Sequence, residues 1–227
     1  MNILYLNSHD TGRYVQPYGY AVDTPNLQRL AEEGTLFRDA HCAAPTCSPS
    51  RAALLTGQSA HRTGMVALAH RGGQLLHPER HLAHFLKTHG YETVKAGFTH
   101  VGTDSAAHGY SRTGNDDFKN SEATTQFAVD FLHQQRSSST PFYLDCGYLE
   151  THRVEWVKHG YSQEQDRPGD GDGNSGYVMP PPIFADCPET RRDWLDYRHS
   201  VERLDYHYGR ILGALEATGL AEDTLIL

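Results

Sequence analysis

Cysteine is scarce in this sequence, and its spacing points away from two common classes of small site. The 227 residues contain four cysteines, with no CxxC pair and no spacing typical of a zinc finger. They are Cys42, Cys47, Cys146 and Cys187. Cys42 and Cys47 are close enough in sequence for a disulfide, but we expect four reduced thiols, as in a reducing compartment.

Long apolar runs are also missing. No apolar run approaches the roughly 18 residues that a membrane-spanning helix needs. Met1 leads straight into a strand pattern at residues 3–6, without the charged segment and long apolar core of a signal peptide. We therefore expect a soluble, cytoplasmic protein with no membrane span, unless a leader precedes the chain.

Basic residues are fewer than acidic ones. The chain has 20 Lys and Arg against 28 Asp and Glu, and its formal net charge is −8. This balance argues against a general nucleic-acid-binding protein. It does not exclude an anionic substrate, because the local field of a pocket matters more than the total charge. The 15 histidines predict a net charge that falls in magnitude on mild acidification.

Strand patterns and helix patterns alternate along the whole chain, without an internal repeat. Strands are expected at residues 2–6, 91–96, 142–148 and 223–227, and helices at 24–34, 48–57, 81–89, 121–135 and 189–218. A further extended piece is expected from Leu36 toward Cys47, and a surface excursion at 160–188. The alternation indicates an α/β protein with a mainly parallel sheet and helices on both faces.

One stretch, CSPSRAALLTG from Cys47 to Gly57, combines a reactive residue with a helix start. Ser48 is a suitable N-cap, and Pro49 suits the first helical turn because its φ is fixed. Cys47 is thus expected at a helix N-terminus, where free N–H groups favour a thiolate or a bound anion. The plain alternative is a buried, inert cysteine beside an ordinary capped helix.

The same stretch resembles the sulfatase signature, C-x-P-S-R-x-x-x-L-T-G, at every fixed position. In that family the cysteine is oxidised to formylglycine, whose hydrate is the nucleophile and a metal ligand. The resemblance therefore implies both roles for Cys47, a formylglycine-generating maturation enzyme as partner, and an alkaline-phosphatase-like fold. Arg51 lies one helical turn on and is implied to hold the hydrate or the sulfate oxygens.

The resemblance also implies a metal site just after the first strand. His9 and Asp10 occupy the place of the family's pair of aspartates. Asp10 is a hard ligand that suits calcium or magnesium, whereas the imidazole of His9 suits manganese or zinc. We expect a divalent metal bound by Asp10, His9 and Cys47, calcium first and manganese, magnesium or zinc as alternatives. His9 beside the metal without binding it, or a plain polar loop, also remains open.

A later motif departs from the family pattern. The stretch GFTHVG that begins at Gly97 resembles G-K-x-H-x-G, with Phe98 in the position of the lysine. The resemblance implies that His100 stabilises the second hydroxyl of the nucleophile. It also implies that the missing cation comes from elsewhere, such as Arg71 or Lys95.

Four further residues complete the expected site. His152 follows the strand at 142–148 and resembles the family's H-x-P-H region, so the general-acid role toward the leaving group falls to it. Arg153, Arg71 and His70 are the expected substrate-binding residues. The alternative for each of the four is an ordinary loop residue exposed to solvent.

The resemblance covers residues 1–227 but only about the N-terminal half of a typical family member. In the family, a strand of the type D-T-L-I-L is followed by a segment with further metal ligands. We therefore expect the N-terminal part of a sulfatase catalytic domain, truncated before that segment. By itself such a chain is expected to bind metal weakly and to turn over slowly or not at all.

The expected function is hydrolysis of a sulfate ester or sulfamate on a sulfated small molecule or glycan. The motifs Cys-Ser-Pro-Ser-Arg, Gly64-Met65, His-Val-Gly and Thr-His-Arg look most like the N-sulfoglucosamine sulfohydrolase branch. One alternative is a phosphonate or phosphate-ester hydrolase of the same superfamily. Another is a non-catalytic descendant that binds sulfated glycans, which the histidine at 9 and the phenylalanine at 98 favour.

Overall fold

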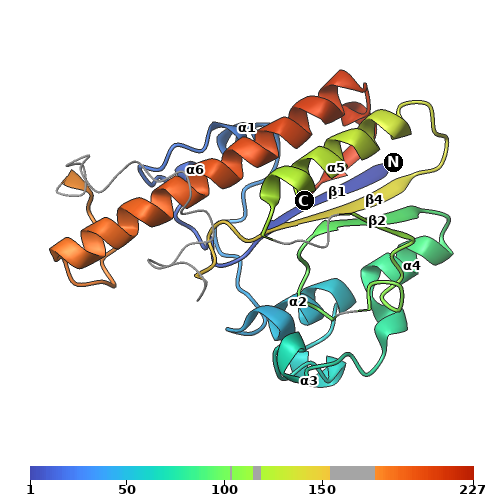
Figure 1. The fold of residues 1–227 in the computed structure, drawn as a ribbon, viewed down its shortest axis with the longest axis horizontal. Helices are drawn as coiled ribbons and strands as arrows, with labels where there is room; N and C mark the ends of the chain where they lie inside the picture. Colours follow the sequence, from blue (N-terminus) through green and yellow to red (C-terminus); the bar gives the residue numbers. More distant parts are fainter. Residues whose placement is uncertain (103, 115–118, 154–176) are drawn as a thin grey trace. The chain divides into compact units, whose positions relative to one another are not determined.

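A computed structural model of the chain describes residues 1–102, 104–114, 119–153 and 177–227 (Figure 1). The chain forms two compact units. The first contains Met1–Asn7, Phe37–Tyr148 and Arg210–Leu227, and the second contains Ser8–Leu36 and Leu149–Gly209. Each unit is described by itself. Most of the excursion expected at 160–188 lies outside the described residues.

The sheet has five strands in the order β3-β2-β4-β1-β5. Their bounds are Asn2–Ser8 for β1, Glu92–Gly97 for β2, Arg112–Gly114 for β3, Phe142–Tyr148 for β4 and Thr224–Ile226 for β5. The pairs β1–β5, β2–β3 and β2–β4 are parallel. The α/β class and the mainly parallel sheet are therefore confirmed.

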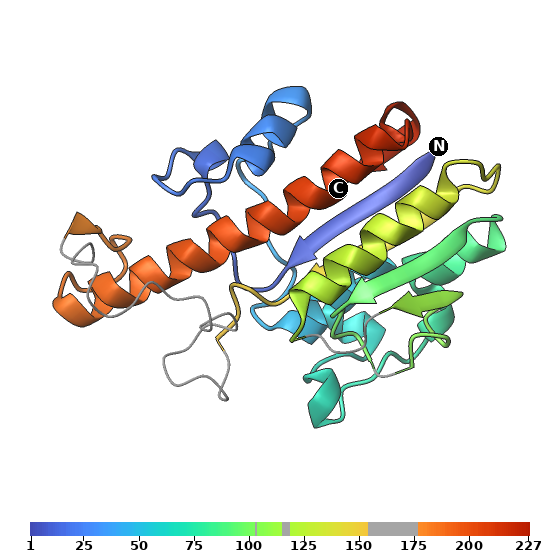
Figure 2. The same ribbon diagram turned by 45° about the horizontal axis from the view of Figure 1, so that its top comes forward.

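Helices cover both faces of this sheet in the first unit. Phe142 of β4 packs edge-to-face against Phe131 of α5 (Ser121–Gln135), with ring centroids 5.4 Å apart. Its neighbour Tyr143 belongs to a cluster with Ala83 and Leu86 of α4 (Leu82–Thr88). Successive side chains of a strand point to opposite faces, so α5 and α4 lie on opposite sides of β4. Figure 2 shows α5 running lengthwise over the sheet.

The remaining helical elements are all shorter than α5, apart from the 30-residue helix α6. They are η1 (Gln16–Tyr18), α1 (Pro25–Glu33), α2 (Cys47–Thr56), α3 (Ala60–Thr63), η2 (Ala69–Arg71), η3 (Pro78–Arg80), α6 (Pro188–Ala217) and η6 (Ala221–Asp223). Every helix predicted from the sequence is present. Within the described ranges, none of these helices is long and apolar enough to cross a membrane.

The start of α2 differs from the expectation. The helix begins at Cys47, because Thr46 is extended and its carbonyl oxygen accepts from Ser50 N–H at 3.0 Å. Ser48 is therefore not the N-cap, and its hydroxyl instead accepts from the backbone N–H of Ala69 at 3.0 Å. Pro49 still falls within the first turn, where a missing N–H costs no helical hydrogen bond.

Helix α1 of the second unit is capped from a distance. Thr24 precedes the helix but its side chain makes no cap, and it accepts instead from Gln16 N–H at 2.9 Å. The buried carboxylate of Asp205 accepts from the N–H groups of Asn26 and Leu27, at 3.1 and 2.8 Å. A carboxylate at this end satisfies free donors and complements the helix dipole. The expected local cap is thus replaced by a residue of α6.

Two other stretches differ from what the sequence led us to expect. The extended piece expected from Leu36 toward Cys47 contains no strand. Strand β3, in contrast, was not predicted, because its three residues carry no apolar run. It forms by pairing with β2, Val94 opposite Arg112 and Ala96 opposite Gly114. A strand specified by its neighbour leaves little trace in local sequence.

Candidate active site

Packing of α2 in the first unit brings Cys47 beside His100. Ala52 and Leu55 of the helix form a cluster with Met65 and Val101, and Val101 directly follows His100. The Sγ atom of Cys47 lies 3.1 Å from Nδ1 of His100. The sequence predicted catalytic roles for both residues, and the structure brings their side chains into contact.

The loop that carries His100 depends on its backbone. Gly97 has a φ of +75°, and a Cβ atom there would lie 2.3 Å from the carbonyl oxygen of Gly147. His100 itself has a φ of 55°. A non-glycine residue in this left-handed region is uncommon, and such strain gathers at functional sites. The backbone therefore holds the imidazole against Cys47 at a conformational cost.

The second nitrogen of His100 is also engaged. Nε2 lies 3.0 Å from Nδ1 of His70, and the two rings are within 6° of parallel. Cys47, His100 and His70 thus form one chain of hydrogen bonds. His70 was expected as a substrate-binding residue, and its link to His100 had no signal in the sequence. Phe98, which replaces the family lysine, packs against the His100 ring at a centroid distance of 4.7 Å.

Arg51 lies on the same face of α2 as Cys47, four residues on. Its Nη1 donates to Oδ1 of Asn7 at 2.5 Å, and Nδ2 of Asn7 donates to Oδ1 of Asp145 at 2.8 Å. The hydroxyl of Tyr110 donates to the other carboxylate oxygen at 2.5 Å. The buried side chains of Asn7, Asp145 and Tyr110 therefore form a hydrogen-bonded network that orients the guanidinium of Arg51.

Burial dominates the electrostatics of this network. It raises the pKa of the fully buried Asp145, although the Tyr110 hydrogen bond and the charge of Arg51 act against the rise. Burial together with the Asp145 charge raises the pKa of Tyr5 to about 12. Sequence reasoning missed these residues. The single aspartate in the otherwise apolar strand 142–148 was the signal that pointed to them.

The second unit gathers other predicted residues after β1. Oδ2 of Asp10 lies 3.8 Å from Nε2 of His152, and the rings of His9 and His152 are 5.6 Å apart. The hydroxyl of Thr151 donates to the carbonyl oxygen of His9. Asp10, like His100, has a left-handed backbone, with a φ of 56°. His9, Asp10 and His152 thus lie together at the carboxyl end of a strand, where α/β sheets place their sites.

The predicted arginines have different surroundings. Arg153 forms an ion pair with Asp193 of α6, so a substrate anion would compete with that carboxylate. Arg71 is exposed at the end of η2, next to His70 in sequence. Lys95, the other cation considered, donates to the hydroxyl of Ser105 at 3.0 Å. Which of Arg71 and Lys95 supplies a cation beside the histidine chain stays a prediction.

The chemistry of the donors fits the groups that the family implies. Carboxylate and imidazole ligands, as in Asp10 and His9, suit a divalent cation. At position 47 the side chain meets a histidine nitrogen, which suits a hydroxyl as well as a thiol. Asp10 and His9 belong to the second unit and Cys47 to the first. The metal site that combines them stays a prediction.

A mainly parallel sheet covered by helices, with a cysteine at a helix start beside a histidine and an arginine on the same helix, defines an α/β protein with a candidate nucleophile site. The sulfatase family model matches residues 1–227, so the chain belongs to the sulfatase family. Human N-sulphoglucosamine sulphohydrolase is 28% identical over 249 residues, covering 100% of this chain and 49% of that protein. The chain therefore spans about half the length of this relative.

Solved structures confirm the alkaline-phosphatase-like fold. A protein solved in complex with its substrate, D-glucosamine-2-N,6-O-disulfate, gives a TM-score of 0.69 at 16% identity, over 99% of this chain and 64% of that one. A phosphonate monoester hydrolase from Silicibacter pomeroyi gives 0.66 at 20% identity, over 99% and 61%. At these identities the likeness concerns the fold alone.

Proposed function

We propose that the protein hydrolyses a sulfate ester or sulfamate on a sulfated sugar, through a formylglycine made from Cys47. The observation that carries this proposal is the 3.1 Å contact between Cys47 Sγ and His100 Nδ1, at the start of the signature helix. Membership of the sulfatase family supports it. The substrate class is supported by the name of the human relative and by the disulfated glucosamine bound in a protein of the same fold.

Each residue has a role that follows from its chemistry. When formed, the formylglycine supplies a hydrate hydroxyl as nucleophile, and a divalent metal at Asp10 and His9, calcium in our proposal, supplies positive charge. His100 holds or accepts the proton of the group at position 47 through Nδ1. Arg51 presents its guanidinium fork to sulfate oxygens while Asn7 fixes its orientation.

The leaving group needs a proton, which His152 is suited to give. Its Nε2 lies 3.8 Å from the carboxylate of Asp10, at the carboxyl end of the first strand. Arg153 and Arg71 add positive charge for the sulfated substrate. The leaving atom is oxygen in an ester and nitrogen in a sulfamate, and an imidazole N–H can donate to either.

The first experiment tests the nucleophile. The protein is produced together with a formylglycine-generating enzyme, and the tryptic peptide that ends at Arg51 is weighed. Conversion of Cys47 to formylglycine lowers the peptide mass by about 18 Da. An unmodified thiol under conditions that convert a control sulfatase would contradict the proposal and favour a binding-only descendant.

The second experiment tests the reaction. Turnover of the full-length protein is compared on an aryl sulfate, on N-sulfoglucosamine and on an aryl phosphonate, with Cys47→Ala as control. We expect the two sulfated substrates to be hydrolysed and the variant to be inactive. Faster turnover of the phosphonate would instead support the second candidate, a phosphonate monoester hydrolase. That candidate is considered because a phosphonate monoester hydrolase shares this fold, with a TM-score of 0.66.

A further inference from the structure

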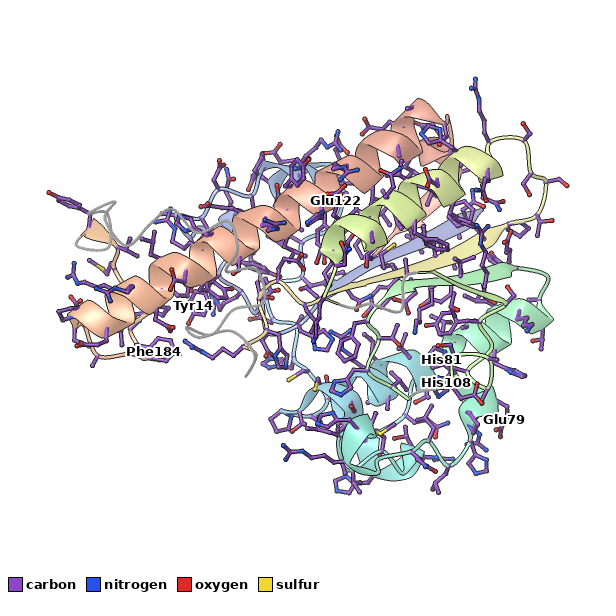
Figure 3. The ribbon with its side chains drawn as sticks, in the orientation of Figure 1. Tyr14, Glu79, His81, His108, Glu122 and Phe184 are labelled. Atoms are coloured by element: carbon purple, nitrogen blue, oxygen red, sulfur yellow. The ribbon has the colours of Figure 1, made fainter. Side chains whose placement is uncertain are left out.

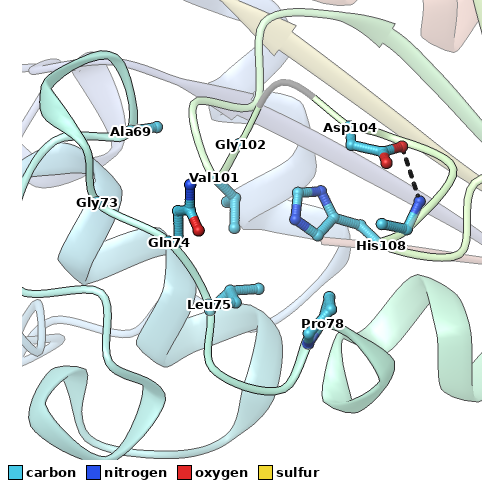
Figure 4. A pocket seen from close by; sticks show the side chains of 10 residues that line it. Ala69, Gly73, Gln74, Leu75, Pro78, Val101, Gly102, Asp104 and His108 are labelled. Carbon is cyan, nitrogen blue, oxygen red and sulfur yellow. Dashed lines mark hydrogen bonds between the residues drawn. The ribbon is translucent and has the colours of Figure 1, made fainter.

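A cavity of about 250 Å³ lies in the first unit between two loops (Figure 4). The first loop contributes Gln74, Leu75 and Pro78, and the second contributes Val101, Asp104 and His108. Pockets for drug-sized ligands measure about 300–1,000 Å³, so this cavity suits a single ring rather than an extended chain.

The position of His108 is fixed by the protein. A Cβ atom on Gly102 would lie 2.6 Å from Cε1 of His108, so the glycine lets the backbone close against the ring. On its other side, His108 stacks on His81 at 5.4 Å, and Figure 3 shows these two residues next to each other. His81 is fully buried and its Nδ1 accepts from Ala83 N–H. The imidazole is thus held in place before any ligand arrives.

The charge of the lining disfavours an anion. Burial lowers the pKa of His108, Asp104 acts against that shift, and Lys95 adds to it. The ring is therefore neutral at pH 7, with one nitrogen as donor and the other as acceptor. Asp104 is acidic, and no lysine or arginine is among the described residues that line the cavity. A sulfate group would meet a carboxylate there without a cation to balance it.

The same lining suits a neutral sugar. Leu75, Pro78 and Val101 offer an apolar wall for the C–H face of a pyranose. The Gln74 amide and the His108 imidazole offer both donors and acceptors, which match hydroxyl groups. Among the contacts of the described residues, neither side chain has a hydrogen bond to protein. Figure 4 shows both directed toward the cavity.

The two loops also carry the histidines of the site. Ala69, which lines the cavity, is followed by His70, and Val101 is preceded by His100. His70 and His100 are joined at 3.0 Å, and His100 contacts Cys47. A ring in the cavity would therefore lie close to the sulfate bound at Cys47, as a neighbouring residue of one glycan does.

We propose that this cavity is a subsite for one uncharged pyranose of the glycan substrate, whose hydroxyls bond to Gln74 and His108. The proposal rests on the proposed function, because it takes its occupant from a sulfated glycan. It narrows the substrate class to an oligosaccharide in which an unsulfated sugar neighbours the sulfated one.

The binding test uses N-acetylglucosamine as a probe of the whole chain. The imidazole signals of His108 are followed by NMR and assigned with a His108→Gln variant. The sugar should shift them saturably, whereas inorganic sulfate should not. Gln74→Leu removes a hydrogen bond at an exposed position and should weaken sugar binding about fivefold. Gln28→Leu, at a half-buried residue of α1 that does not line the cavity, is the control and should leave binding unchanged.

The kinetic test separates this proposal from the proposed function. Gln74→Leu should raise KM for a sulfated disaccharide about fivefold more than it raises KM for an aryl sulfate. Gly102→Ala, which presses on His108, should act in the same direction. No response of His108 to the sugar, or an equal response to sulfate, overturns the subsite. If the full-length wild type hydrolyses no aryl sulfate, the proposed function fails, while the NMR result still decides whether the cavity binds a sugar.

Discussion

Two groups of site residues, one in each unit, are held in different ways. The nucleophile cluster (Cys47, Arg51, His70 and His100) has contacts of 2.5 to 3.1 Å, and its Arg51 is linked through Asn7 to the buried Asp145. The loop cluster (His9, Asp10 and His152) has Asp10 Oδ2 and His152 Nε2 3.8 Å apart, with an Asp10 side chain 63% exposed.

This difference shows which functional side chains the fold positions before a substrate or metal binds. Hydrogen bonds in a buried, low-dielectric network are strong and fix side-chain geometry. A pair at 3.8 Å is beyond hydrogen-bond distance, and exposed pairs contribute little. The first unit therefore holds the side chains that provide the nucleophile and bind sulfate in position before any ligand is present. In the second unit His9 is buried, but Asp10 is exposed and its contact with His152 is long, which suits a ligand that a bound cation is needed to order.

The largest expected effect comes from breaking the nucleophile cluster at its centre. His100→Ala removes both hydrogen bonds of the histidine chain and should lower kcat by about 10² to 10⁴-fold. The left-handed backbone at position 100 suits asparagine better than alanine, so His100→Asn is the matched variant for fold. Steady-state kinetics and thermal melting of both variants measure the effect. Near wild-type turnover in either would contradict a preset cluster.

The second prediction concerns pH and the buried histidine of the first unit. Burial, with the charges of His108 and His84, lowers the pKa of His81 from 6.5 to about 3. Because the unfolded chain takes up a proton below pH 6.5 and the folded chain does not, stability should fall as pH drops from about 6.5 toward 3. The slope contributed by His81 is at most about 1.4 kcal/mol per pH unit.

A matched variant isolates this slope. His81→Asn keeps an acceptor for the N–H of Ala83 at the start of α4 and removes the titrating group. Urea unfolding between pH 4 and 7 should show a flatter pH dependence for the variant than for the wild type. Parallel curves would show that His81 is solvated and that the first unit is less tightly packed than described.

The third prediction removes the Asn7 side chain, which orients Arg51. Asn7→Leu removes the link between Arg51 and Asp145 and leaves one oxygen of a buried carboxylate without this donor. The free energy of unfolding should drop by about 1–3 kcal/mol. Turnover should fall as well, because Arg51 loses its orientation. The double variant Asn7→Leu/Asp145→Asn, which removes the charge, should recover part of the stability but not the turnover. Recovery of both would argue against a positioning role.

The smallest effect is expected in the second unit. Arg153 and Asp193 form a largely exposed ion pair. Asp193→Asn should change stability by less than about 1 kcal/mol. Arg153→Gln should change stability as little, but should raise KM for the sulfated substrate if Arg153 binds it. Equal KM values for the two variants would show that Arg153 does not bind the substrate. The substrate contacts would then be sought in the nucleophile cluster of the first unit.

Part of the site was accessible from the sequence because its signals are local. The signature around Cys47 fixes residue types at set spacing, and a helix places Cys47 and Arg51 on one face. His100 and Asp10 follow strands, which marked them as strand-end residues. The roles given to His152, Arg153 and Arg71 remain predictions, since the structure places these residues without testing what they do.

Other parts were not accessible because they depend on contacts distant in sequence. The link of His70 to His100 spans 30 residues, and that of Asn7 to Asp145 spans 138. The cap of α1 comes from Asp205, and β3 exists only through its pairing with β2. No local pattern encodes such partners, because each is chosen by packing rather than by propensity.

The sequence by itself determined the alternation of strands and helices, the family, and the cysteine proposed to become the nucleophile. Periodicity, capping residues and fixed motif spacing are short-range properties, so they can be recognised in the sequence without the tertiary structure. The tertiary structure alone decided what surrounds that cysteine. Burial of Asp145, the tie from Asn7 to Arg51 and the stacking of His108 on His81 arise only when distant segments share one core, where buried polar groups must find partners.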